Sequence, residues 1–440
     1  MNAVLLAVIV MVGLSLARVH VILSLVIGSL VGGLVAGLPL TDTLDAFQNG
    51  VKNGAQIALS YAMLGAFAMA IAHAGLPKLL ADGLIGKIKQ SSATGGLKWL
   101  LFVILALMAM ASQNLIPIHI AFIPLIVPPL LVVMNRLQID RRAVACILTF
   151  GLVNTYMFLP YGFGDIFLNQ IILKNVNEAG LQTGELSMIQ TMAIPALGML
   201  LGLLIAVFVT YRKPVQYADS LLMGGQADGA DNEPVNKLAI ITAVVAIVLA
   251  FVVQLWTDSL LIGSIVGFAI FMMTGVVRWR EANDVFNDGI KMMAMIGFIM
   301  ICAQGFAEVM KATGQIDALV QNAMQIFGDN RAMAALAMLL IGLVVTMGIG
   351  SSFSTIPIIA TIYVPLCMAM GFSVPATVAL VATAGVLGDA GSPASDSTLG
   401  PTMGLNADGQ HDHMTGSVIP TFVHYNIPLI IFGWIAAMVL

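Results

Sequence analysis

The stretch Gly388–Thr402 reads "GDAGSPASDSTLGPT" and concentrates polar residues in a chain that is otherwise strongly apolar. It holds two carboxylates, whereas the chain of 440 residues is 59% hydrophobic and only 9% charged. Its glycines and Pro393 would interrupt a helix that begins near Pro375, and the interruption leaves backbone carbonyls free to bind a cation. An acid at membrane depth costs about 2.5–3.5 kcal/mol, so it normally has a partner or a function. The stretch therefore predicts a broken transmembrane helix at a functional site.

The rest of the composition predicts an all-α polytopic membrane protein. Soluble chains carry about 25% charged residues, and apolar segments of spanning length recur along this chain, whose mean hydropathy is +0.99. We expect membrane lipid around the chain. The net charge of -4 includes no basic patch, so we expect no nucleic-acid partner. The three cysteines lie in apolar runs and predict packing residues rather than disulfides. We expect no cofactor and no metal other than Na⁺.

The chain contains two copies of one design. "DAFQNGVK" at 45–52 returns as "DVFNDGIK" at 284–291, and the spans that follow end at Gly75 and Gly314. "SQNLIPIHIAFIPL" at 112–125 has its counterpart in "SFSTIPIIATIYVP" at 352–365. Several matches in the same order indicate a duplication. We expect a first repeat at 1–211, a cytoplasmic linker at 212–237 and a second repeat at 238–440.

The two repeats are expected to face opposite ways in the membrane. We predict about five spans in each, plus a re-entrant hairpin at 98–135 or 332–370 and a broken helix at 143–172 or 375–402. An odd number of spans inverts the second copy. With this topology 14 of the 18 Lys and Arg residues lie on one side, which places both termini outside the cell's inner (plasma) membrane. A plain even bundle without re-entrant segments is the alternative.

Inverted repeats with interrupted helices are typical of secondary transporters, whose sites lie near the membrane midplane. A carboxylate there can bind either a cation or a proton, and this competition is the simplest basis for exchanging Na⁺ against H⁺. "NTYMFLPYGFGD" at 154–165 breaks the matching helix of the first copy and supplies another acid. The predicted cation- and proton-binding residues are Asp389, Asp396, Ser392, Ser395, Thr398 and Asp165. The alternative is an interfacial loop whose Ser and Asp residues cap helices.

The hairpin tips should close this site with small polar side chains. The predicted substrate-binding residues at the tips and the first break are Ser112, Gln113, Asn114, Asn154, Thr155, Ser351, Ser352, Ser354 and Thr355. His119 is a further candidate for substrate contact or proton relay. The alternative is that the hydroxyls bond back to their own helices and that the histidine is packed. "DGQHDH" at 408–413 resembles a metal-ligand cluster, but without a second cluster it predicts a solvated loop with a pH-sensing role open to it.

The motif at 388–402 resembles the glycine-aspartate, serine-proline, serine-aspartate motif of the NhaC-type Na⁺/H⁺ antiporters, within the ion transporter superfamily. The similarity is greatest to the YuiF-like branch, described either as antiporters or as amino-acid (histidine) transporters. It implies that Asp389, Ser392, Ser395, Asp396 and Thr398 bind Na⁺. It also implies a homodimer that moves a transport domain against a scaffold domain, like an elevator. Ser112-Gln113-Asn114 departs from the Ser-Asn-Thr tip of the superfamily, which argues against dicarboxylate transport.

The first reading is therefore a Na⁺/H⁺ antiporter rather than an enzyme. The second moves an amino acid or another small organic ion, coupled to Na⁺ or H⁺, on the same scaffold. A third reading is an intramembrane aspartyl protease, because "GFGD" at 162–165 matches the motif of those enzymes. The earlier acids lie in predicted loops, however, so that no partner acid is in place. A channel is a fourth reading, but a single asymmetric acid cluster suits alternating access better.

Overall fold

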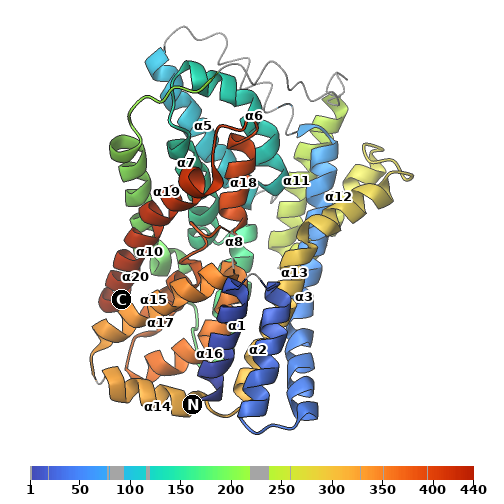
Figure 1. The fold of residues 1–440 in the computed structure, drawn as a ribbon. Helices are drawn as coiled ribbons and strands as arrows, with labels where there is room; N and C mark the ends of the chain where they lie inside the picture. The colour runs from blue at the N-terminus through green and yellow to red at the C-terminus, as the bar shows by residue number, and fades with distance from the viewer. Residues whose placement is uncertain are drawn as a thin grey trace.

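The computed structural model describes the whole chain except residues 1, 18, 77–78, 80–93, 115–118, 219–236, 258, 328, 350 and 394. Every regular element in the described part is a helix, with no strand among them (Figure 1). The predicted all-α class is therefore confirmed.

The helices of the first half are α1 (Ala3–Leu16), α2 (Val21–Val35), α3 (Leu40–His73), α5 (Thr94–Asn114), α6 (His119–Arg136), α7 (Arg141–Phe158), α8 (Phe163–Asp165), η1 (Ile166–Leu173), α9 (Lys174–Glu178), α10 (Met188–Ile205) and η2 (Ala206–Thr210). Those of the second half are α11 (Lys237–Thr257), α12 (Leu260–Met273), α13 (Ala282–Ala312), α14 (Ile316–Phe327), α15 (Arg331–Ile349), α16 (Ser352–Ala369), α17 (Val374–Val386), α18 (Asp396–Leu405), η4 (His413–Val418), α19 (Ile419–Thr421), η5 (Phe422–Asn426) and α20 (Ile427–Val439). The η elements are π-helical turns within longer helices.

Local signals explain where several helices start and stop. Asp140 accepts a hydrogen bond from the Arg142 amide (2.9 Å) and caps α7, and Ser373 accepts one from the Ala376 amide (3.1 Å) and caps α17. Gly75 and Gly314 follow α3 and α13 in the left-handed region (φ +79° and +62°), where glycine is strain-free. The two glycines that the sequence marked as span ends are thus confirmed as helix terminators.

The long helices α3 and α13 pack antiparallel along most of their length, at the right of Figure 1. A Cβ added at Gly50 would lie 2.6 Å from the Cα of Gly305, and one added at Gly289 would lie 2.4 Å from the Cα of Ala66. Glycine and alanine let the two backbones touch, as is common between membrane helices. The hairpins α1–α2 and α11–α12 flank this pair (Figure 1).

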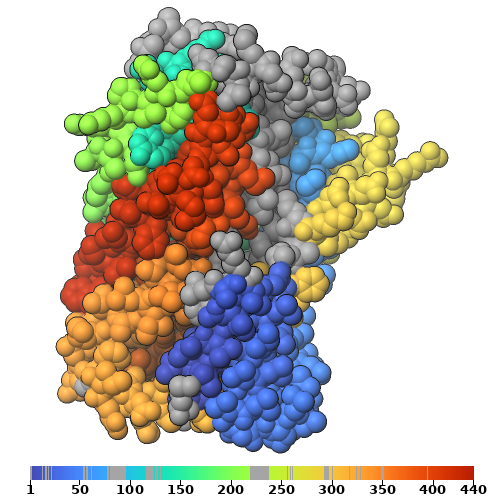
Figure 2. Space-filling model, viewed as in Figure 1, coloured from blue at the N-terminus to red at the C-terminus, as the bar shows by residue number. Residues whose placement is uncertain are grey.

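The remaining helices form a second group on the other side of the molecule (Figure 1). It contains α5–α10, with their π-helical turns, and α14–α20. Its surface in Figure 2 is dominated by the C-terminal segments, orange to red, while the first fifty residues form a separate blue area beside them. The two groups meet where α13 contacts α16 and where α1 contacts α14 and α15. Gln304 Nε2 of α13 donates to Asn175 Oδ1 of α9 (3.1 Å), and Asn2 Nδ2 donates to the Gln315 carbonyl (2.8 Å).

Both predicted hairpins and both predicted broken helices appear as paired helices. The hairpins are α5–α6 and α15–α16, and the broken helices are α7 with α8–α9 and α17 with α18. The first break bends its helix by 57° between Phe158 and Phe163. Five described helices are long and apolar enough to span a bilayer alone, and the bent pair would make a sixth. The chain is thus a multi-pass membrane protein.

Some element lengths differ from the prediction. The span predicted to begin near residue 55 begins at Leu40, so that Asp42 and Asp45 lie in α3 rather than in a loop. Its first turns carry polar residues on an exposed face, and a helix that projects beyond the apolar layer tolerates these. Conversely, α1 and α2 have only 14 and 15 residues, fewer than the roughly 20 that cross a bilayer. Most of the predicted linker, 219–236, lies outside the described residues.

Candidate functional site

Asp389 is the centre of a buried hydrogen-bond cluster, and only 6% of its surface is exposed. Its Oδ1 accepts from the Ser395 hydroxyl (2.5 Å), and its Oδ2 accepts from the Ser352 hydroxyl (3.1 Å) and from the hydroxyl of Tyr156. The Tyr156 and Ser352 hydroxyls are also in contact with each other (2.9 Å). One carboxylate therefore joins the first broken helix, the second hairpin tip and the second break.

The backbone around Asp389 is held in its broken form by the C-terminal helix. Gly388 and Gly391 adopt φ of +91° and +130°, which side chains rarely tolerate. Asn426 accepts a hydrogen bond from the Gly388 amide (2.8 Å) and donates to the Ala390 carbonyl (3.0 Å). A Cβ at Gly391 would lie 2.6 Å from the Cα of Phe422. An amide side chain thus replaces the helical partners that the break removes.

The other predicted residues of this break stabilise the start of α18. Ser395 caps the helix, since its hydroxyl accepts from the Ser397 amide (3.1 Å). Thr398 donates to the Ser392 carbonyl (2.5 Å) and Ser392 itself is fully buried. Asp396 lies half-buried in the first turn, where the positive end of the helix dipole favours an acid. Ser395 and Asp396 therefore stabilise the start of α18, as the capping interpretation expects, and they are also among the predicted cation-binding residues.

At the first break, Asn114 at the end of α5 stabilises the broken backbone, as Asn426 does at the second break. Asn114 Oδ1 accepts from the Gly164 amide (3.1 Å), and the Asn114 carbonyl would lie 1.9 Å from a Cβ at Gly162. Gly162 has φ of +58°, so that glycine is required there for both reasons. Asp165 follows in α8 and accepts hydrogen bonds from Asn169 (2.6 Å) and Gln170 (3.3 Å). The structure thus keeps Asp165 with its own helix, apart from the Asp389 cluster.

An aromatic layer separates the first break from the Asp389 cluster. The ring of Phe353, beside Ser352, lies 4.9 Å from the ring of Phe163 and 5.2 Å from that of Tyr156, between ring centres. Phe167 packs edge-on against Tyr156 at 4.8 Å. The sequence analysis did not select Tyr156, although it stands two residues after Asn154 in the quoted break motif. The signal that could have identified Tyr156 is its hydroxyl group, which stands among apolar residues just before the first break.

The remaining tip residues divide into two kinds. Ser112, Thr155 and Thr355 donate to carbonyls of their own helices, as the alternative interpretation expects. Gln113 Oε1, Asn154 Oδ1 and Ser354 Oγ are buried and have no hydrogen-bond partner among the described residues. Ser351 is the N-cap residue before α16, and its side chain makes no capping hydrogen bond. The side chain of His119, at the start of α6, lies outside the described residues.

The loop "DGQHDH" is partly buried, so the prediction of a solvated loop is wrong for two of its residues. Asp408 and Arg141 form a bidentate ion pair (2.5 and 2.6 Å) with both side chains fully buried. Burial alone would raise the pKa of Asp408, but hydrogen bonding to Arg141 and its charge outweigh this and hold that pKa below its usual range. Burial, assisted by the charge of Arg141, lowers the pKa of His411 to about 4. No group of three or more His, Cys, Asp or Glu side chains suited to a metal occurs among the described residues.

This loop is connected to the second break by hydrogen bonds. His411 Nε2 contacts the Ser417 hydroxyl (2.9 Å), and Ser417 contacts the Thr402 hydroxyl of α18 (2.8 Å). His413 lies against Thr402 through Nδ1 (2.8 Å) and against the Pro393 carbonyl through Nε2 (3.0 Å). Since a carbonyl only accepts, Nε2 of His413 carries the proton. The loop therefore helps to fix the same break that presents Asp389.

Comparison with known sequences gives matches along the whole chain. A model of the "Na+/H+ antiporter family" matches residues 147–434, and a second, of the "Na+-H+ antiporter family", matches residues 2–88. An uncharacterized membrane protein of Vibrio parahaemolyticus is 57% identical over 100% of both chains. A Bacillus subtilis protein named "Putative amino acid transporter YuiF" is 47% identical over 100% of both chains.

Two solved transporter structures share the fold. MtrF of Neisseria gonorrhoeae, described with a class of antimetabolite efflux pumps, has a TM-score of 0.58 at 16% identity and covers 91% of this chain and 85% of its own. YdaH of Alcanivorax borkumensis has a TM-score of 0.57 at 14% identity and covers 90% of this chain and 87% of its own. At such identities the likeness concerns architecture alone. The two family models and the full-length relatives identify the sequence, and the chain belongs to the Na⁺/H⁺ antiporter family.

Proposed function

We propose that the protein is a secondary active transporter that exchanges Na⁺ for protons at Asp389 and Asp396. The observation that carries the proposal is the buried Asp389 carboxylate, which is bound by hydroxyls from three elements. These elements come from both halves of the chain. A movement of one broken helix or of the second hairpin tip would therefore change the environment of the acid directly.

The oxygen atoms around Asp389 suit both occupants of an exchanger. Hydroxyls donate to a carboxylate when no cation is present, and they can rotate to offer a lone pair when Na⁺ binds. Ser352, Ser395 and Tyr156 are placed to do this. Asp396, half-buried in the next turn, would supply the second charge. Na⁺ and H⁺ then compete for one site, which is what coupled exchange requires.

The packing of α3 against α13 supports the proposal that the repeats are inverted. Gly50 faces Gly305, and Ala66 faces Gly289. The numbering offset that relates Gly50 to Gly289 in the second copy also relates Ala66 to Gly305. A two-fold rotation about an axis in the membrane plane would therefore convert each of the two contacts into the other. We propose residues 1–211 and 238–440 as the repeats. In an elevator mechanism the α3–α13 group would be the scaffold, and the transporter would act as a homodimer.

The orientation in the plasma membrane is also part of this proposal. The loop after α6, the segment after η2 and the loop after α18 lie on one face, since Val215 N donates to the Gln138 carbonyl (3.0 Å) and Gln410 Nε2 donates to the Ala218 carbonyl (2.8 Å). Three arginines at 136, 141 and 142 belong to this face. The positive-inside rule then makes it cytoplasmic and places both termini outside.

Coupled transport of an amino acid or another small organic ion is the second candidate. It is favoured by the buried polar atoms of Gln113, Asn154 and Ser354, which have no hydrogen-bond partner in the part of the chain that the structure describes and so could bind a solute. The printed name of the Bacillus subtilis relative agrees with this candidate. The two candidates share one scaffold and differ in whether Na⁺ alone drives proton movement.

The test uses purified protein in proteoliposomes loaded with a pH dye. A Na⁺ pulse alone should change the internal pH, and Asp389→Asn should abolish the change. Asp288→Asn is the matched control, because Asp288 forms an exposed ion pair with Lys291 on α13. If Na⁺ alone leaves the internal pH unchanged and the pH changes only when an amino acid is added, the protein is a solute-coupled transporter rather than a Na⁺/H⁺ exchanger. An unchanged response of Asp389→Asn would refute the assignment of the site.

A further inference from the structure

The second break reaches the surface of the protein between its two acids. Asp389 is buried and Asp396 is half-buried, but Pro393, which stands between them, is exposed. Around the first acid the backbone is held by Asn426, and just after the second acid Thr149 of α7 donates to the next carbonyl (2.8 Å). An exposed turn has few packed neighbours and so opens easily. The turn between the two acids therefore depends on hydrogen bonds from other elements.

His413, the first residue of η4, supplies such a bond. Its Nε2–H donates to the Pro393 carbonyl (3.0 Å), and its Nδ1 lies 2.8 Å from the Thr402 hydroxyl of α18. In a neutral imidazole with a proton on Nε2, Nδ1 is an acceptor, so the Thr402 hydroxyl donates to it. The ring thus joins the exposed turn to the helix that begins with Asp396.

A buried network orients this half-buried ring. The Thr402 hydroxyl contacts the Ser417 hydroxyl (2.8 Å), which contacts Nε2 of His411 (2.9 Å), and all three residues are buried. A hydroxyl can donate one hydrogen bond while it accepts others, so Ser417 can donate to Thr402 while Thr402 donates to His413. Networks in which each polar group has its partner are rigid. The bond to the exposed turn is therefore anchored in the interior.

The turn carries groups of the proposed ion site. Ser395, two residues after Pro393, donates its hydroxyl to Asp389 (2.5 Å), and Asp396 is the next residue. The place of the Pro393 carbonyl therefore affects how Ser395 and Asp396 lie relative to Asp389. Binding groups that are already in place lose little conformational freedom when a ligand binds, and the affinity is higher for this reason.

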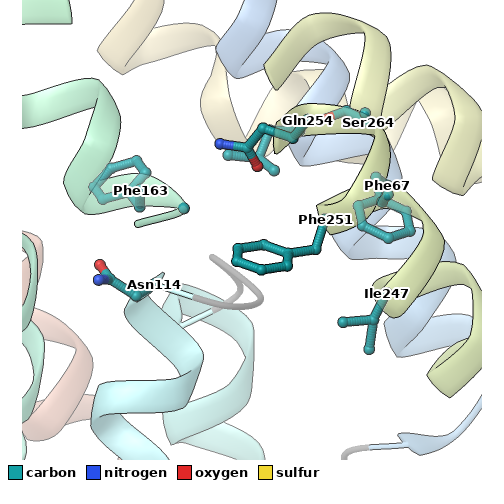
Figure 3. A pocket seen from close by; sticks show the side chains of 11 residues that line it. Phe67, Asn114, Phe163, Ile247, Phe251, Gln254 and Ser264 are labelled. Carbon is teal, nitrogen blue, oxygen red and sulfur yellow. The ribbon is translucent and has the colours of Figure 1, made fainter. Parts of the chain in front are cut away.

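The side of Asp389 toward the first break offers no comparable bond. There the aromatic layer covers the carboxylate, and Phe163 of this layer lines a recess together with Asn114, Phe251 and Gln254 (Figure 3). None of the residues that line the recess is ionisable, and none belongs to the second break. A change in the recess would reach Asp389 through ring packing, whereas His413 is bonded to the break that carries this acid.

We propose that His413 is a positioning residue of the ion site, which holds the turn between Asp389 and Asp396 through its bond to the Pro393 carbonyl. The inference rests on the proposed exchange of Na⁺ for protons and adds to it a residue that acts through the backbone. Without this bond the turn would have to become ordered when Na⁺ binds. The Na⁺ concentration at half-maximal response should then rise about three- to tenfold, as the loss of one hydrogen bond implies.

Two substitutions separate the two ring nitrogens. His413→Gln can place an amide nitrogen near the position of Nε2 and keep the bond to Pro393, whereas the shorter side chain of His413→Asn replaces Nδ1 alone. In the proteoliposome assay, His413→Asn should show the rise in half-maximal Na⁺ concentration at an unchanged maximal rate, and His413→Gln should stay within about twofold of the wild type. His73→Asn is the matched control, because His73 is exposed at the end of α3 and lies 3.7 Å from Glu281.

Amide hydrogen exchange of the purified protein gives a second readout that does not depend on transport. Amides at 391–397 should exchange faster in His413→Asn than in the wild type or His413→Gln. Equal half-maximal Na⁺ concentrations in the two variants, a loss of maximal rate alone, or equal amide exchange in His413→Asn and the wild type would overturn the proposal. If the wild type gives no Na⁺-driven pH change, the exchange function is refuted, while amide exchange still decides whether His413 holds the turn.

Discussion

The buried ion pair between Arg141 and Asp408 allows a quantitative test of how the two broken helices are held together. The Arg141 guanidinium makes two bonds to Asp408, one to the Leu405 carbonyl (2.8 Å) and one to Asn135 Oδ1 (3.0 Å). Asp408→Asn preserves the shape of the side chain but leaves a buried cation unpaired. Breaking a buried pair in this way costs about 3–5 kcal/mol, a large part of the stability of a typical domain.

The same geometry predicts an order among variants. Arg141→Met should destabilise at least as much as Asp408→Asn, because the Leu405 carbonyl and Asn135 lose their donor as well. In the double variant, with Arg141→Met and Asp408→Leu, no charge remains unpaired, so it should be more stable than Arg141→Met alone. Two acceptors still lack a partner, so it should not reach the wild type.

The measurement is unfolding in mixed micelles titrated with a denaturing detergent. Asp288→Asn, which removes an exposed ion pair, serves as the control and should change the free energy of unfolding by less than about 1 kcal/mol. If Asp408→Asn is as stable as this control, the pair is solvated and the two broken helices are not held together by it. A double variant less stable than Arg141→Met would equally contradict the reasoning.

Four further outcomes are expected. Tyr156→Phe keeps the ring packing but removes the hydroxyl bond to Asp389, so apparent Na⁺ affinity in the pH-dye assay should change by roughly tenfold or more. Asp396→Asn should abolish Na⁺-driven pH change with normal folding by size-exclusion chromatography, and retained transport would argue against its role. Gly391→Ala should lower the melting temperature more than Gly409→Ala, because only the first meets another backbone. The pKa of His411, about 4, lies below the ordinary 6.5, so folding stability should fall as pH drops from 6.5 toward 4, by at most about 1.4 kcal/mol per pH unit, and His411→Gln should flatten this slope.

Much of the architecture was predictable because its signals are local. Apolar runs predicted helices, and glycines and prolines predicted both breaks within a few residues, as the interruptions after Phe158 and Val386 confirm. The same signals failed for the lengths of α1 and α3. Hydropathy predicts which residues can lie in the bilayer, whereas the residues at which a helix begins and ends also depend on caps and on packing against neighbouring helices.

Less of the candidate site was predictable. Asp389, Ser352 and Ser395 were selected from sequence, and the structure brings these three together. Asp165 was selected on the same grounds, yet its carboxylate is bound within its own helix. The motif alone cannot separate these acids, because both follow a glycine-rich break.

The sequence by itself determined the membrane class and the positions of the breaks, since each depends on the residues within one segment. Only the tertiary structure decided which carboxylate is enclosed, that Tyr156 holds it, and that Arg141 pairs with Asp408. These contacts join residues more than two hundred positions apart. Their free energy comes from removing charged and polar groups from water together, and that depends on packing between helices rather than on the chain around any one residue.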